Sequence, residues 1–143
     1  RLCHILSNSR FLGDALNKSV ESVTWLGSDN DLQPRSRESL DVQTHASLER
    51  NAGSINDFAN SIRAMRRHEI ERIGLGWMSG VIDDKASLAG MTDVYDAAID
   101  ASLTWAIRHQ TQEMGLDEAP AATPSSAWDA TAARRSISAP TPT

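Results

Sequence analysis

The chain has 143 residues, a net charge of −5 and a single cysteine. This length suits one ordinary domain, which can bury a core without disulfides or metals. The acidic balance argues against a dedicated nucleic-acid-binding domain, because phosphate neutralisation needs Lys and Arg clustered over a broad face. The apolar uncharged run at 74–82 is too short to span a bilayer, and the N-terminus lacks the order of a signal peptide. We therefore expect a cytoplasmic protein that binds neither membrane nor nucleic acid.

The N-terminal part of the chain is predicted to be helical as far as Gly27. Apolar residues recur at i, i+3 and i+4 over 2–16, which is the spacing of an amphipathic helix. A polar break at 7–9 interrupts this pattern, and Ser9 can cap a new helix there. Further apolar residues at 20–26 extend the helical region.

The middle of the chain is predicted to hold a polar turn and a third helical region. Residues 28–34 are mostly polar and end in proline, which is typical of a turn. A weakly amphipathic helix is expected from Ser36 to Asn51, and Gly53 is expected to end it.

Two longer helices are predicted next. Ser54 has the side chain of an N-cap residue, and the helix that it starts is expected to run to about Gly80. Two aspartates, Asp83 and Asp84, are expected to cap the start of the last helix. This helix is predicted to run through roughly Met114 and to end at Gly115.

The composition changes abruptly after Asp117, where Ala, Pro, Ser and Thr predominate. Such a segment is expected to be a linker without a core of its own. Strand signals are nearly absent from the whole chain. We therefore predict an all-α fold, a bundle of about four to six helices over residues 1–116, followed by a flexible linker at 117–143.

Apolar periodicity gives each of the two long helices a predicted core face. For the helix that begins at Ser54, this face comprises Ile55, Phe58, Ala59, Ile62, Met65, Ile73 and Trp77. For the last helix, it comprises Leu88, Ala89, Thr92, Tyr95, Ile99, Leu103, Ala106 and Ile107.

The segment RAMRRHEIERIG, residues 63–74, contains four arginines, one histidine and two glutamates. Arg66 and Glu69 fall inside the predicted core face, and two residues three apart on one helix can meet. Because an unpaired buried charge costs several kcal/mol, we predict that this pair forms a structural polar seam. The last helix offers counterparts, in an Arg66–Asp96 or a Glu69–Tyr95 contact.

Arg63, Arg67 and Arg72 fall on the flanks of the predicted core face or outside it. These side chains form either an ordinary solvated helix face or a docking patch for an acidic partner. Nucleic-acid binding is disfavoured, because the patch lacks interleaved aromatic residues and a recognisable reading helix. We predict that any contact with a partner or a neighbouring domain uses these three arginines.

No motif in the chain supports catalysis or metal binding. The glycine-rich stretch 74–80 faintly resembles a dinucleotide fingerprint, but it lies at the end of a helix and lacks the preceding strand. Close helix packing and helix termination explain it better. The histidines and aspartates lack the spacing of a metal site, and no nucleophile motif is present. We therefore assign no catalytic residue, no metal ligand and no cofactor to this chain.

The order of several segments resembles the glutamine synthetase adenylyltransferase family. These segments are RLCHILSNSRFLGDAL at 1–16, RRHEIERI at 66–73, GVID at 80–83 and LAGMTD at 88–93. In the family, a helical segment of the form R-L-x-x-I-L-x-x-S-x-[FY]-L-x-D-x-L leads to R-R-x-E-x-x-R-I, just upstream of a nucleotidyltransferase domain. One departure is Trp77, because many relatives have an acidic residue after the R-I string.

The resemblance implies a fragment of a bifunctional enzyme with two nucleotidyltransferase halves joined through helical regions. One half removes AMP from a tyrosine of glutamine synthetase and the other adds it from ATP with Mg²⁺, under control of glutamine and a PII signal protein. The family's Gly-rich and S-D-x-D catalytic motif is absent here, so no catalytic residue can be assigned. The fragment resembles the helical regulatory region that connects the halves, and its opening is closer to the leader of the second half.

On this interpretation, the partners are the adjacent nucleotidyltransferase domains, with glutamine synthetase and PII as partners of the parent enzyme in nitrogen assimilation. An alternative of a different class is a free-standing helical interaction module with no enzymatic activity. A reading frame that continues into the catalytic motif would distinguish the first hypothesis from the second.

Overall fold

The computed structural model describes residues 1–19 and 21–115, which contain six helices and no strand. The helices are α1 (Leu2–Asn8), α2 (Arg10–Lys18), α3 (Glu21–Trp25), α4 (Arg37–Arg50), α5 (Ile55–Met78) and α6 (Asp84–Glu113). The predicted all-α fold with four to six helices is thus confirmed. The predicted linker at 117–143 lies outside the described residues.

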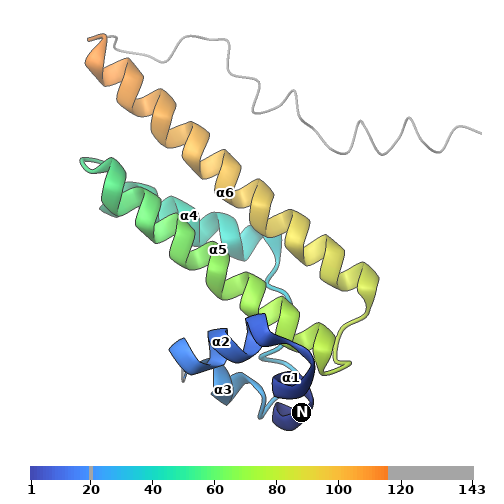
Figure 1. Ribbon diagram of the computed structural model, residues 1–143. Helices are drawn as coiled ribbons and strands as arrows, with labels where there is room; N and C mark the ends of the chain where they lie inside the picture. Colours follow the sequence, from blue (N-terminus) through green and yellow to red (C-terminus); the bar gives the residue numbers. More distant parts are fainter. Residues whose placement is uncertain (20, 116–143) are drawn as a thin grey trace, which may run out of the picture. The chain divides into compact units, whose positions relative to one another are not determined.

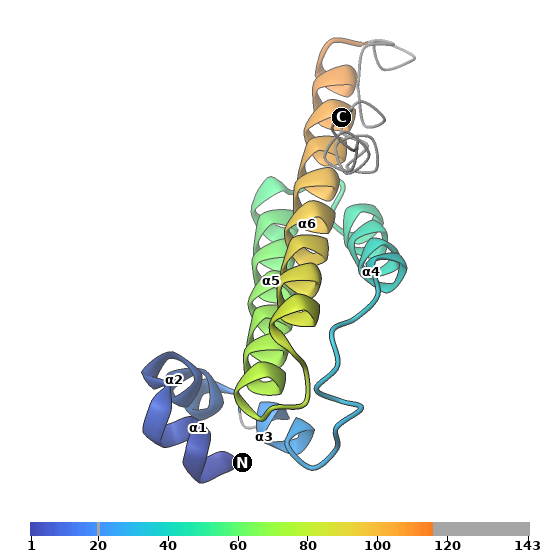
Figure 2. The same cartoon turned by 90° about the vertical axis from the view of Figure 1, so that its right-hand side faces the viewer.

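The chain divides into two units, 1–105 and 106–143, and the boundary falls within α6. Within the first unit, α4, α5 and the first part of α6 run side by side, as both views show (Figures 1 and 2). The short helices α1, α2 and α3 gather around the C-terminal end of α5 (Figures 1 and 2).

Short polar side chains begin the helices at the places that the sequence predicts. Ser9, Ser36 and Ser54 each accept a hydrogen bond from the backbone N–H three residues further on. The carboxylate of Asp83 does the same at the start of α6, at 2.7 Å. Each bond satisfies one of the backbone donors that a helix N-terminus leaves without a partner.

The helix ends follow the sequence less closely. Gly80 and Gly115 adopt φ angles of 69° and 65°, a left-handed conformation that glycine takes without strain, and they follow α5 and α6 as predicted. The predicted end of α4 at Asn51 is confirmed, but the prediction that Gly53 terminates this helix is wrong. Helix α4 ends at Arg50 with Asn51 as its C-cap, so the chain has left the helix before it reaches this glycine.

The buried apolar side chains form two clusters in the first unit. The larger cluster lies between α4, α5 and α6 and comprises Leu40, Leu48, Phe58, Ile62, Met65, Ile73, Ile82, Val94, Ala97, Ala98, Ala101 and Trp105. The smaller cluster joins the N-terminal helices to α5 and comprises Ile5, Leu12, Leu16, Leu32 and Leu75. In the larger cluster the rings of Phe58 and Trp105 stack, with centroids 5.9 Å apart.

The predicted core face is largely right for α5 and wrong for α6. In α5, the two end members of the predicted face, Ile55 and Trp77, are exposed, and the Trp77 indole donates to Asp84 at 2.6 Å. In α6, the predicted members Leu88 and Ile99 are 69% and 61% exposed. The helix instead buries a face of mostly small residues that ends in a tryptophan: Gly90, Val94, Ala97, Ala98, Ala101 and Trp105.

The segment that joins α3 to α4, residues 28–36, crosses α5 and α6 closely, and we call it the strap. A Cβ atom added to Gly76 would lie 2.5 Å from the carbonyl oxygen of Leu32. One added to Gly90 would lie 2.7 Å from the Cβ of Pro34. These approaches leave no room for a side chain, so close packing explains the glycine within the stretch 74–80.

Candidate functional site

A buried carboxylate lies at the centre of the predicted polar seam. Glu69 on α5 is only 2% exposed. Its carboxylate oxygens lie 3.5 Å from Nε of Arg35 on the strap and 3.1 Å from Nε of Arg72, one turn further along α5. Two guanidinium groups therefore surround this carboxylate, and their charge offsets the cost of removing it from water.

Arg72 connects this seam to the strap and to α3. Its guanidinium donates a hydrogen bond to the carbonyl oxygen of Asp31 at 2.7 Å and lies over the ring of Trp25, 4.4 Å from the centroid. The same tryptophan meets the edge of the His68 ring, with centroids 4.5 Å apart. The side chain of Arg72 is 11% exposed, so its contacts lie inside the fold rather than on a free surface.

The positions of Arg66 and Arg72 are the reverse of those predicted from the sequence. Arg66, predicted in the seam, is exposed and lies over the ring of Tyr95, 5.8 Å from its centroid. Arg72, predicted on the outside, is paired with Glu69. The physical reason is that the strap and α3, not α6, cover this side of α5. They supply the partners of Arg72, which are Asp31 and Trp25.

Neither predicted contact to α6 is recorded among residues 1–19 and 21–115. Asp96 pairs with Arg37 at the start of α4, at 3.9 Å, rather than with Arg66. Arg37 also pairs with Asp41 and Asp100. Burial opposes the charge of this guanidinium, but the hydrogen bonds to the two carboxylates raise the pKa of Arg37 above its ordinary value.

A second buried carboxylate was not found by reasoning from the sequence. Glu71 is 5% exposed, and its side chain lies 3.9 Å from Nε of Arg67, which is itself 73% exposed. Arg35 was also missed as a partner of Glu69. The only signal for Arg35 in the sequence is its position directly after the polar turn. The apolar periodicity of the helices does not predict which helix the strap contacts.

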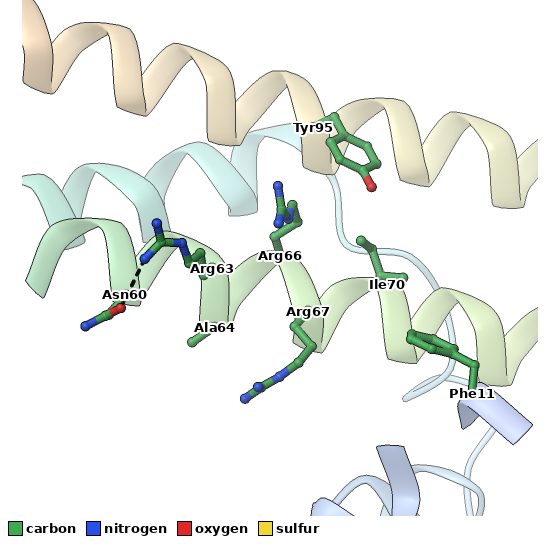
Figure 3. Close-up of a pocket in the computed structure, with 8 residues that line it drawn as sticks. All are labelled: Phe11, Asn60, Arg63, Ala64, Arg66, Arg67, Ile70 and Tyr95. Carbon is green, nitrogen blue, oxygen red and sulfur yellow. Dashed lines mark hydrogen bonds between the residues drawn. The ribbon is translucent and has the colours of Figure 1, made fainter. Parts of the chain in front are cut away.

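The exposed arginines of α5 line an open groove of about 510 Å³ between α2, α5 and α6 (Figure 3). The residues that line it are Phe11, Asn60, Arg63, Ala64, Arg66, Arg67, Ile70 and Tyr95. Figure 3 shows Arg66 on the side of α5 that faces Tyr95, with Asn60 and Phe11 at the two ends of the groove. Of the three predicted docking arginines, the structure brings Arg63 and Arg67 into this groove, whereas Arg72 lies in the seam.

The charge of this groove is positive. Arg63 donates to the amide oxygen of Asn60 at 3.3 Å, and Arg66 faces an aromatic ring, so neither forms an ion pair with a described residue. Guanidinium groups bind carboxylates through paired hydrogen bonds, and their flat faces stack on aromatic rings. The arrangement therefore suits an acidic group that also carries apolar surface.

Two kinds of feature are absent from the described part of the chain. No group of three or more His, Cys, Asp or Glu side chains there could hold a metal ion. None of the helices there is long and apolar enough to cross a membrane.

Comparison with known proteins identifies relatives along most of the chain. The family model for glutamate-ammonia ligase adenylyltransferase matches residues 1–126. A bifunctional glutamine synthetase adenylyltransferase/adenylyl-removing enzyme of Bifidobacterium longum (strain DJO10A) is 74% identical over 121 residues, 85% of this chain and 11% of that protein. The enzyme of the same name from Mycobacterium marinum (strain ATCC BAA-535 / M) is 30% identical over 118 residues, 80% of this chain and 12% of that protein.

The chain therefore spans only about a tenth of the length of the curated relatives that it matches. No solved structure gave a significant match. The family match, the ordered blocks and the helical fold agree with one another, and the chain belongs to the glutamate-ammonia ligase adenylyltransferase family.

Proposed function

We propose that this chain is a non-catalytic helical segment that connects and regulates the two nucleotidyltransferase halves of a bifunctional adenylyltransferase/adenylyl-removing enzyme. The observation that supports this proposal is the extent of the match. The similarity runs through 121 residues of this chain but reaches only 11% of the relative from Bifidobacterium longum. A segment of that size within a two-activity enzyme leaves most of the polypeptide for the catalytic halves.

The proposed parent enzyme attaches AMP from ATP to glutamine synthetase and removes it again, with Mg²⁺ at its catalytic sites. Its proposed regulators are glutamine and a PII signal protein, and its proposed compartment is the cytoplasm. None of these ligands is assigned to a residue of this chain. The role of the chain is to pass a change at one half to the other through packed helices.

The packing suits such a role. Arg72 joins α5 to the strap, and the two glycines without room for a side chain bring the strap against both α5 and α6 at one end of the bundle. Coupling between distant sites needs a contiguous network with discrete packing arrangements. The groove lined by Arg63, Arg66 and Arg67 provides a surface on which a neighbouring domain can act on that network.

The test uses the full-length enzyme and both of its reactions. AMP attachment to glutamine synthetase and AMP removal are measured with and without glutamine and PII, in the wild type and in the variant Arg63→Ala/Arg66→Ala/Arg67→Ala. We expect the effector response of the variant to be smaller. The matched control is Arg50→Ala, at an exposed arginine of α4 outside the groove. An unchanged effector response in the triple variant would argue against the regulatory role.

The alternative of a free-standing interaction module is tested separately by the reading frame. A frame that continues from this segment into a nucleotidyltransferase motif supports the proposed function. A frame that ends without such a motif rejects it.

A further inference from the structure

Helix α6 has two apolar faces. Its small residues pack inward, whereas Leu88, Tyr95, Ile99 and Leu103 point outward and are 69%, 44%, 61% and 44% exposed. At 3.6 residues per turn these four fall within an arc of roughly 80° on the side away from the core. We call them the outer stripe.

A helix that is apolar on opposite sides is usually covered on both. The outer stripe carries four large apolar side chains, whereas the inner face carries mainly glycine and alanine, with Val94 and Trp105 as its larger members. Scattered exposed apolar residues are normal, but a contiguous row at helical spacing marks an interaction site. The spacing of seven, four and four residues is the one that a second helix packs against.

The charges on the two sides of the outer stripe differ. On the α4 side, Asp96 and Asp100 are held by Arg37, so their carboxylates already have a partner. On the α5 side, Arg63 and Arg66 form no ion pair with a described residue. Tyr95 belongs both to the outer stripe and to the arginine groove, so the two surfaces are continuous.

We propose that the outer stripe and the arginine groove together dock an acidic amphipathic helix from another region of the same long polypeptide. Its apolar residues cover Ile99 and Leu103, and its carboxylates bind Arg63 and Arg66. The relatives are about nine times longer than the matched segment, which leaves ample chain to supply this helix. The inference rests on the proposed function, because it requires this segment to be part of that longer enzyme.

The experiment places a photo-reactive benzoyl-phenylalanine at position 99 of the full-length protein and identifies the cross-linked peptide by mass spectrometry. We expect an intramolecular cross-link to a segment with several Asp or Glu residues beside an apolar stripe. The same probe at position 42 is the control, because Val42 is 67% exposed on α4 outside this surface. Its yield should be several-fold lower.

A second arm tests the charges. Arg63→Glu/Arg66→Glu should lose most of the cross-link at position 99, whereas Arg50→Glu should retain it. Because Arg63 and Arg66 are exposed and form no ion pair with a described residue, the variant should unfold at the same temperature as the wild type, which excludes a folding defect.

Three results would overturn the inference: a cross-link between two copies, a cross-linked segment without acidic residues, or a yield at position 99 no higher than at position 42. Each of these three results would be measured in a protein whose reading frame includes the catalytic halves, so it would count against the docking inference alone. A reading frame that lacks them rejects the proposed function instead.

Discussion

Arg72 and Glu69 form an ion pair inside the bundle, with 3.1 Å between Nε and Oε2 and side chains 11% and 2% exposed. The arginine also donates to the carbonyl of Asp31 and covers the ring of Trp25. This pair therefore connects α5 to the strap and to α3. Its burial distinguishes it from the exposed ion pairs of the molecule, which contribute little to stability.

Arg72→Ala should lower the free energy of unfolding by about 3 kcal/mol, the low end of the range for breaking a buried pair. The loss leaves Glu69 with only Arg35, which is itself 41% exposed and 3.5 Å away. Urea unfolding followed by circular dichroism measures the change. Arg63→Ala is the control and should change stability by less than about 0.5 kcal/mol, because that side chain is exposed. Equal effects of the two substitutions would contradict a structural role for Arg72.

Gly90→Ala should destabilise the protein although alanine is the better helix former. The new methyl group would lie 2.7 Å from Pro34 and 3.2 Å from Ile73, and overpacking of this kind costs about 1–3 kcal/mol. Gly13→Ala is the matched control within α2. Its methyl group would meet only a leucine side chain at 3.5 Å, so a gain of about 0.5–1 kcal/mol is expected. Thermal unfolding of the two variants should shift in opposite directions.

Arg37→Gln should lower stability by about 1 kcal/mol, because this arginine holds three carboxylates at the junction of α4 and α6. The carboxylates are 46–58% exposed, so salt should screen the contribution. Urea unfolding at low and at high salt tests this point. A stability difference that stays the same in 1 M salt would show that packing, rather than charge, gives the effect.

The pKa of Arg37 already lies above its ordinary value, and this shift has a direct consequence for pH dependence. A raised folded-state pKa gives a contribution that is present at every pH below the unfolded-state pKa and is lost only as the pH rises through the folded-state value. The stability difference between wild type and Arg37→Gln should therefore not vary with the charge of the guanidinium near neutral pH. A titration of this difference between pH 6 and pH 9 checks the expectation.

Ser54→Ala should cost about 1 kcal/mol, because the serine side chain accepts from the backbone N–H of Asp57 at 3.3 Å and caps α5. Ser54→Gly should cost only a few tenths of a kcal/mol, since glycine is also tolerated as an N-cap. The order Ser, Gly, Ala in unfolding midpoints is the outcome to look for. If alanine were as stable as serine, the cap would contribute nothing.

The starts of the helices could be predicted because a cap is a local feature. Ser9, Ser36 and Ser54 are recognised by their side chains and by the apolar pattern that follows each of them. The end of α4 was predicted at Asn51, which is its C-cap, but the role given to Gly53 was wrong, because Asn51 itself ends the helix.

The inward face of α6 could not be predicted because periodicity finds the larger apolar residues, and in this helix most of them, apart from Val94 and Trp105, lie outside. Tyr95 and Ile99 mark the stronger apolar stripe in the sequence, but they are exposed, whereas Ala97 and Ala101 are buried. The prediction for Arg66 fails for a different reason, because this residue falls inside the predicted core face of α5 but is exposed in the structure.

The strap has a further consequence, which concerns the order of folding. Its contact with Arg72 joins residues 41 positions apart, from Asp31 to α5, whereas α5 and α6 are joined by a short turn. Local contacts form sooner than distant ones, because a longer loop must be closed. We expect α5 and α6 to pair first and the strap to close over them last, so that substitutions at Pro34 accelerate unfolding and leave the refolding rate nearly unchanged. The last segment to close would then set how long the folded bundle persists.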